Sequence, residues 1–327
     1  RAMLSITLFT CTLAPDAGSR ISAASLSRRS VLGGALAAVG APASVSAVIK
    51  GTPVDDAEAA AVGAVGLWID LDGCSVCRKG LPATCTGTLI APDLVLSAQH
   101  CIDIPKELNG TLDRVIFGAN MFKKGVPERR IQAYKTTSEY GFPPAQGGDL
   151  VLIKLTQPAP AAWRPVELPL GLLPNKAEQD EAKRKDSPFY PDGVGLPAVS
   201  AYGFGEQSTR GTQDADYYAS GVLKKVELQL RTEVRPWAPG FLTKPVTKGE
   251  GTCAGDSGGP ALLRLQDPQG RGVRQLVLGV QAEASVPCED NQQLFIYPDY
   301  FKEFIVRASA DLGSPIRPTL NWREYSS

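Results

Sequence analysis

The sequence lacks a net charge, because its 34 Lys and Arg residues balance its 34 Asp and Glu residues. A role on nucleic acid or at a membrane surface therefore has no electrostatic support. The sequence also lacks an apolar run of the about 20 residues that cross a bilayer, since the stretch at residues 31–39 is much shorter. No repeat of fixed period is visible. His100 is the only histidine, so it is the only candidate for an imidazole base.

The composition favours a folded chain made of short strands. Hydrophobic residues make up 43% and charged residues 21%, which argues against disorder. The 33 glycines and 26 prolines favour many short strands over long helices. We expect strands in the short apolar or alternating runs at residues 64–71, 86–90, 94–97, 114–118, 150–155, 222–230 and 276–280. Helical periodicity is convincing only where Tyr300, Phe304 and Ile305 share one face.

The first 47 residues are typical of an export leader. Two adjacent arginines, Arg28 and Arg29, precede a short apolar run, and small residues follow up to Ala47. The arginine pair resembles a twin-arginine signal, which predicts a secreted or periplasmic protein. A mitochondrial transit peptide is the alternative, because this region is rich in Ser and Arg and has Asp16 as its only acid.

Two further segments are expected to lie at the surface. Residues 174–191 combine mixed charge with few apolar side chains, which predicts a solvated insertion loop. The prolines that follow Gly313 predict a surface tail over residues 309–327 rather than another core element.

Three segments, around His100, Asp149 and Ser257, concentrate residues that can carry chemistry. A serine hydroxyl is a weak nucleophile at neutral pH and needs an adjacent base, and that base needs a buried acceptor that holds its tautomer. Ser257, His100 and Asp149 can take these three roles. Glycines on both sides of Ser257 leave room for a substrate. They also free the backbone N–H groups of Gly255 and Ser257 to bind a developing oxyanion.

The order of these residues along the chain separates two kinds of hydrolase. Gly255, Ser257 and Gly259 also match the nucleophile elbow of α/β-hydrolases, in which the histidine follows the serine. Here the only histidine precedes Ser257, so that alternative fails. The order His100, Asp149, Ser257 is instead that of the chymotrypsin type, and it differs from the Asp, His, Ser order of subtilisins.

Motifs around the three candidates resemble those of the chymotrypsin-like (trypsin-fold) serine protease family. Residues 97–101, Ser-Ala-Gln-His-Cys, resemble its histidine motif, with Gln99 in place of a small residue. Residues 148–155 resemble its aspartate strand. Residues 255–260, Gly-Asp-Ser-Gly-Gly-Pro, are identical to its serine motif, which is the most specific of the three.

Two more motifs extend the resemblance over residues 48–308. Residues 201–205 resemble the family's Gly-Trp-Gly strand, with Phe204 in place of Trp, and residues 294–297 followed by a helix resemble its C-terminus. The resemblance implies an all-β fold of two antiparallel six-stranded barrels with a short C-terminal helix. The protease domain would cover residues 48–308, with the active site between the barrels.

The resemblance also implies an activity. His100 and Asp149 on the first barrel and Ser257 on the second would hydrolyse peptide bonds through an acyl-enzyme, without a metal or an organic cofactor. Proteins or peptides would be its substrates. The protein is expected to be a monomer that binds no nucleic acid and is not inserted in a membrane after signal removal. A catalytically silent homologue that acts as a binding protein is the alternative.

The cysteines fit an exported protein of this family. The sequence has seven cysteines, and removal of residues 1–47 would remove Cys11. An even number of cysteines would remain, which in an exported protein predicts disulfides. The family pairs positions that match Cys85 with Cys101 and Cys253 with Cys288. Cys74 and Cys77 have no counterpart, and we expect a local disulfide between them. A redox or zinc site at that pair would need a βαβ context or further ligands nearby, and neither is evident.

In the family, the acid before the nucleophile pairs with the free N-terminus of the mature chain, and this ion pair shapes the oxyanion hole. Asp256 matches that acid, and Val48 begins a segment that resembles the mature N-terminus, with Lys50 in place of a glycine. Cleavage after Ala47 would free the α-amino group of Val48 without a separate activation step. Cleavage after Ala43 is the alternative, and it would leave an inactive precursor with four extra residues.

The resemblance also assigns the primary specificity pocket to Gly251, Thr252, Ala284 and Gln293. Gly251 stands where trypsin-like enzymes carry an aspartate, so no charge is expected at the base. The other three would shorten the pocket and make it weakly polar, which predicts cleavage after small or medium uncharged residues. If the alignment of its segment were shifted by one residue, Glu283 would lie at the pocket mouth and favour substrates with basic side chains. If Glu283 is instead a solvated charge at the rim, it would have no such effect.

Overall fold

The computed structural model describes residues 48–73, 83–172, 198–205, 221–231, 239–266, 270, 272–284, 288–289, 292–318 and 320, all of which belong to one compact unit. The expected leader at residues 1–47, the Cys74–Cys77 pair and the expected insertion at 174–191 lie outside the described residues.

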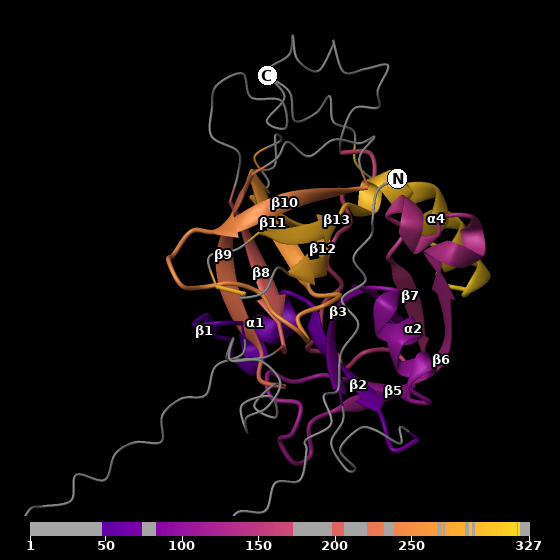
Figure 1. Ribbon diagram of the computed structural model, residues 1–327. Helices are drawn as coiled ribbons and strands as arrows, with labels where there is room; N and C mark the ends of the chain where they lie inside the picture. Colours follow the sequence, from indigo (N-terminus) through magenta and orange to yellow (C-terminus); the bar gives the residue numbers. More distant parts are fainter. Residues whose placement is uncertain are drawn as a thin grey trace, which may run out of the picture. The chain divides into compact units, whose positions relative to one another are not determined.

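Six antiparallel strands form the first barrel, which is coloured indigo to magenta in Figure 1. In the order in which they pair, they are β2 (Ala64–Asp70), β3 (Ala83–Ala91), β4 (Leu94–Ser97), β7 (Val151–Leu155), β6 (Glu128–Thr136) and β5 (Thr111–Ile116). The barrel closes because β5 pairs with β2 as well as with β6. Strands β3, β4 and β7 are almost entirely buried, and β4 and β7 are correspondingly rich in Leu, Val and Ile.

Six more antiparallel strands, coloured orange to yellow in Figure 1, form the second barrel. In pairing order they are β8 (Ala198–Gly203), β9 (Lys224–Leu230), β10 (Gly240–Pro245), β13 (Gln293–Ile296), β12 (Val273–Ala284) and β11 (Pro260–Gln266). Pairing of β11 with β8 closes this barrel, and the short β1 (Thr52–Pro53) adds to β9 from outside. Its interior includes Phe241 and Phe295, whose rings stack 5.7 Å apart. The predicted pair of six-stranded antiparallel barrels is therefore confirmed.

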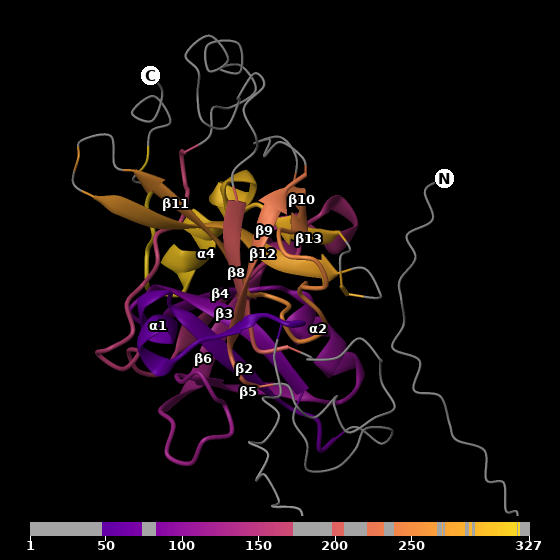
Figure 2. The same ribbon diagram turned by 90° about the vertical axis from the view of Figure 1, so that its left-hand side faces the viewer.

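The barrels pack through a shared core. Tyr202, Phe204 and Val280 from the second half belong to the same buried cluster as Leu89 and Val151 of the first barrel. Figure 2 shows the first barrel directly beneath the second, with β3 and β8 at the junction. This packing brings strand ends of the two barrels, which are far apart in the sequence, close to one another.

Helical segments in the described residues follow or connect the strands, among them the 3-10 turns η1 (Thr137–Tyr140) and η2 (Pro144–Gln146) before β7. The predicted C-terminal helix is present as α4 (Lys302–Asp311), which follows the 3-10 turn η5 (Pro298–Phe301). Two short helices, α1 (Asp56–Ala61) and α2 (His100–Glu107), are not among the elements expected from the sequence. The first has six residues, and the second contains Pro105, so neither carries a clear helical pattern. No helix in the described ranges is long and apolar enough to cross a membrane.

The segment expected to be a surface tail contacts the first barrel. Ser314 Oγ donates to Asp93 Oδ1 at 2.5 Å and accepts from Lys154 Nζ at 2.5 Å. Lys154 and Asp93 also form an ion pair. Leu320 is buried, and its N–H donates to the Leu170 carbonyl at 3.4 Å. Helix α4 ends at Asp311, before Gly313 with φ 72°, and the described residues beyond it stay in contact with the protein.

Candidate active site

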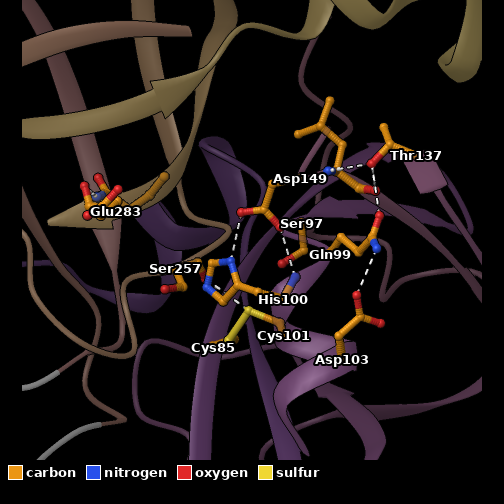
Figure 3. Close-up of polar contacts among 12 residues, drawn as sticks. Cys85, Ser97, Gln99, His100, Cys101, Asp103, Thr137, Asp149, Ser257 and Glu283 are labelled. Atoms are coloured by element: carbon orange, nitrogen blue, oxygen red, sulfur yellow. Dashed lines mark hydrogen bonds and ion pairs between the residues drawn. A yellow bond between two sulfur atoms is a disulfide. The ribbon is translucent and has the colours of Figure 1, made fainter. Parts of the chain in front are cut away.

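His100 and Asp149 come together because the strands beside them are neighbours. Ser97, the last residue of β4, pairs with Val151, the first residue of β7. His100 follows β4 and Asp149 precedes β7, so the two lie at the same end of the barrel (Figure 3). Asp149 Oδ2 lies 2.7 Å from His100 Nδ1, and Asp149 Oδ1 accepts from the His100 backbone N–H at 2.9 Å. Both carboxylate oxygens are therefore engaged by one residue.

This pairing controls the charge of the imidazole. Burial lowers the pKa of His100, but the charge and hydrogen bond of Asp149, together with the charge of Asp103, raise that pKa above its ordinary value. The protonated imidazole is thus better stabilised in the folded protein than in the unfolded chain. This contribution to stability is fully present below the unfolded pKa and is lost as the pH rises through the folded pKa.

Ser257 lies in a tight turn that leads into β11. Gly255 and Gly258 on either side have φ angles of 88° and 81°, a left-handed conformation that favours glycine. A Cβ atom on Gly258 would lie 1.9 Å from Ser97 Oγ, so the turn approaches the end of β4 too closely for any side chain there. The Ser257 carbonyl oxygen is 3.7 Å from Cys101 Sγ, and Figure 3 shows the Ser257 side chain beside the imidazole of His100.

Thr86, in β3 of the first barrel, anchors this turn. Its backbone N–H donates to the Ser257 carbonyl at 2.8 Å, and its hydroxyl donates to the Gly255 carbonyl at 3.1 Å. The same hydroxyl accepts from the Phe204 N–H at 3.0 Å, and the Thr86 carbonyl accepts from Ser97 Oγ at 2.7 Å. Sequence reasoning missed Thr86, because nothing in the local pattern of β3 marks it.

Asp256 is completely buried behind the turn. Its Oδ1 accepts from the Gly205 N–H and its Oδ2 from the Cys253 N–H, each at 2.8 Å. Val48 is also completely buried, and the Ile49 N–H that follows it donates to the Gly251 carbonyl at 2.9 Å. Val48 has φ 47°, which is strained for a β-branched residue.

The residues assigned to the specificity pocket lie close to one another. Ala284 pairs with Gln293 across β12 and β13, and Gln293 Nε2 is 3.1 Å from the place where a Cβ atom on Gly251 would stand. Gln293 is completely buried, and in the described part of the chain its Nε2 has no hydrogen-bond partner. Thr252 Oγ1 donates to Oε1 of Gln281, a buried residue that sequence reasoning missed.

Glu283 is exposed, and a register shift separates it from Gln281. It pairs with Leu294, which leaves Ala284 opposite Gln293. In this register Ala284 and Glu283 are neighbours on β12, and of the two only Ala284 pairs with Gln293. Figure 3 shows Glu283 on the strand across from Ser257 and His100.

Two disulfides brace the site. Cys85 and Cys101, with Cα atoms 6.3 Å apart, join β3 to the residue directly after His100. Cys253 and Cys288, with Cα atoms 5.4 Å apart, join the turn that carries Ser257 to the segment beyond β12. Both pairings are those implied by the sequence resemblance.

Comparison with known proteins gives a family match. A family model described as Trypsin matches residues 75–305. Chymotrypsin-like elastase family member 1 from Macaca fascicularis is 28% identical over 185 residues, which cover 54% of this chain and 61% of that protein. Brachyurin from Leptuca pugilator is 27% identical over 183 residues, covering 54% of this chain and 69% of brachyurin. The chain thus spans less than two thirds of the length of the elastase relative.

Solved structures give a match in fold. Human heparin binding protein superposes with a TM-score of 0.55 and 20% identity, covering 84% of this chain and 100% of that one. A mutant of the same human protein gives a TM-score of 0.54 and 19% identity over the same shares. At this identity the likeness concerns the fold alone.

Titration of His100 tests the electrostatics of the His100–Asp149 pair. Since the chain has one histidine, its imidazole resonances in NMR spectra are unambiguous. We expect a pKa above the ordinary 6.5 in the wild-type protein. In Asp149→Asn the pKa should fall below that value, because burial then acts without the opposing carboxylate. Asp103→Asn should cause a smaller decrease, and an unchanged pKa in Asp149→Asn would show that the assigned cause is wrong.

Proposed function

The chain belongs to the trypsin family, and we propose that it is a secreted serine endopeptidase in which Ser257, His100 and Asp149 form the catalytic triad. The protease domain covers residues 48–308. The observation that carries this proposal is the double contact of the Asp149 carboxylate with His100, beside a turn that presents Ser257 to the same imidazole. Two disulfides in the described part of the chain support an oxidising, extracytoplasmic location.

The proposed reaction is a series of proton transfers and bond changes that involve the three residues of the triad. Asp149 accepts the Nδ1 proton of His100, which leaves Nε2 as the base that removes the hydroxyl proton of Ser257. Ser257 Oγ attacks the carbonyl carbon of the peptide bond, and the new oxyanion is stabilised by the N–H groups of Gly255 and Ser257. The C–N bond breaks as His100 gives the proton to the leaving amine, and the acyl group remains on Ser257. His100 then removes a proton from water, the water oxygen attacks the acyl carbon, and the bond to Ser257 Oγ breaks as His100 returns the proton to Ser257.

Two features of the site support these roles. The raised pKa of His100 means that Asp149 stabilises the imidazolium that forms when the serine is deprotonated. The Gly255 carbonyl is held by the Thr86 hydroxyl, on the barrel that carries the base. This bond fixes the peptide group that follows Gly255 and so restrains the turn that carries the N–H groups of Gly255 and Ser257, and such preorganisation is what stabilisation of a developing charge requires.

We propose that Val48 is the first residue of the active enzyme and that its α-amino group pairs with Asp256. The torsion φ of Val48 is defined by the carbonyl carbon of the preceding residue. Cleavage after Ala47 removes this torsion and with it a strain of about 1–3 kcal/mol. The burial of Val48 and the pairing of Ile49 with Gly251 support a segment that is already seated in its final place.

We further propose that the pocket accepts small or medium uncharged side chains. Gln293 is packed against the backbone of Gly251, where it shortens the site. Thr252 and Gln281 supply polar groups without a charge. The exposed Glu283 is a rim residue in this proposal.

Replacement of the nucleophile tests the activity itself. Ser257→Ala should fold with an unchanged melting temperature, lose labelling by a fluorophosphonate, and lower kcat for a peptide substrate by about 10⁶-fold. Ser200→Ala, a serine on β8 that contacts Glu227, is the matched control and should retain wild-type turnover.

The same experiment distinguishes the alternative of a catalytically silent binding protein of this fold. A protein named for binding heparin has this fold, so the fold by itself does not distinguish that alternative from the proposed activity. It predicts that the wild-type protein is neither labelled nor active, and such a result would end the proposed function.

Sequencing of the N-terminus tests the proposed start. The active protein recovered after export should begin at Val48, and a form extended back to residue 44 should be at least about tenfold less active because its α-amino group cannot reach Asp256. Active protein that begins at any other residue refutes the proposal.

Chromogenic peptides that differ only before the scissile bond test the pocket. The wild-type enzyme should prefer Ala or Val to Phe, and Gln293→Gly should shift this ratio toward Phe by about tenfold because the pocket becomes deeper. Glu283→Gln is the control and should not change the ratio. A strong wild-type preference for Arg or Lys that is lost in Glu283→Gln would mean that Glu283, not Gln293, determines specificity.

A further inference from the structure

Gln99 lies between the end of β4 and the start of α2, directly before His100, and only 3% of it is exposed. Figure 3 shows its side chain pointing away from the imidazole, toward Thr137 and Asp103. Its amide makes four hydrogen bonds. The Nε2 group donates to Asp103 Oδ2 and Ser138 Oγ, each at 2.7 Å, while Oε1 accepts from Thr137 Oγ1 at 2.9 Å and from the Ser138 N–H at 3.1 Å.

These bonds use the full capacity of the amide. A glutamine side chain offers two donor hydrogens and an acceptor oxygen with two lone pairs. All four are occupied in a buried place, where water cannot replace a missing partner. Gln99 therefore has one well-defined position, and so does the backbone that leads into His100.

The partners of Gln99 continue toward Asp149. Thr137, in η1 (Thr137–Tyr140), also bonds to Leu150, the residue directly after Asp149. Its hydroxyl lies 3.2 Å from the Leu150 carbonyl oxygen and accepts from the Leu150 N–H at 3.2 Å. A continuous path of hydrogen bonds thus joins the residue before His100 to the residue after Asp149.

A second path joins the same two segments directly, through the contacts of the Asp149 carboxylate with the ring and backbone of His100. The path through Gln99 and Thr137 runs on the side away from Ser257 (Figure 3). Two links at different points restrict both the separation and the relative rotation of the segments, whereas a single link leaves rotation free.

We propose that Gln99 is a positioning residue, which acts through Thr137 and Leu150 to hold Asp149 against His100 in the geometry needed for proton transfer. This inference rests on the proposed function as far as catalysis is concerned. Its geometric part, the orientation of the pair, can be measured without any catalytic activity.

Gln99 also restrains Asp103, a charged group on the same helix as His100. Asp149 and Asp103 are the charged groups that act on the imidazole, and both favour its protonated form. Loss of the Gln99 amide should release the Asp103 carboxylate and loosen the segment that carries Asp149. The pKa of His100 should then decrease toward the value set by burial.

Gln99→Met tests the proposal, because methionine has similar length and volume but cannot form the four hydrogen bonds. We expect kcat to fall by about tenfold to 100-fold, the effect of a small displacement of catalytic groups, with KM within about threefold of wild type. The NMR titration of the single histidine should show a lower pKa. Thr88→Val is the matched control: it removes a buried hydroxyl of the same barrel that has no partner in the described residues, and it should change neither value.

A second pair of variants applies if Gln99→Met does not fold. Thr137→Ser keeps the hydroxyl and should behave as wild type, whereas Thr137→Val removes it and should lower both kcat and the pKa of His100. Wild-type kcat and wild-type pKa in Gln99→Met, or in Thr137→Val if that pair is used, would overturn the inference. If the wild-type protein has no peptidase activity, the proposed function fails, but the pKa comparison still decides whether Gln99 positions the pair.

Discussion

The turn that presents Ser257 depends on Thr86, a threonine of the opposite barrel. Its backbone and hydroxyl bind the carbonyl groups of Ser257 and Gly255, and its own carbonyl receives the hydroxyl of Ser97. The bonds to Ser257 and Gly255 cross the junction of the barrels, where Gly258 leaves no space for a side chain. Because buried polar groups cannot exchange partners with water, the relative position of the barrels and the conformation of the turn are set by the same few bonds.

His100 and Asp149 are held in place by a different set of contacts. Asp149 contacts His100 with both carboxylate oxygens, and the amide of Gln99 fixes the backbone on the other side. Thr86 and Gln99 therefore act as complementary supports, one for the nucleophile candidate and one for the base. Neither touches the side-chain atoms that would react: Thr86 bonds to the backbone of Ser257, and Gln99 reaches the Asp149 segment through Thr137 and Leu150.

Much of the site could be predicted from the sequence because its chemistry restricts residue type. One histidine leaves no other base, and strands buried on both faces, such as β7, appear as apolar runs. Strand β6 (Glu128–Thr136) could not be recognised, because most of its side chains are exposed or half-buried. The role of Thr86 depends on contacts between barrels that no local pattern records. Gln99 did leave a signal, as a large polar residue in a motif that usually has a small one, but its partners became evident only in three dimensions.

The division of the proposed triad between the barrels has a consequence for biosynthesis. Synthesis proceeds from the N-terminus, so His100 and Asp149 emerge before Ser257 and can pair as soon as the first barrel has formed. A nascent chain at that stage holds an oriented imidazole but no nucleophile. On the proposed function, proteolytic activity would require the second barrel to dock and Thr86 to bind the turn, in addition to release of the Val48 α-amino group. An unfinished chain, whose exposed backbone is the nearest available substrate, would thereby be protected from cleavage by its own active site.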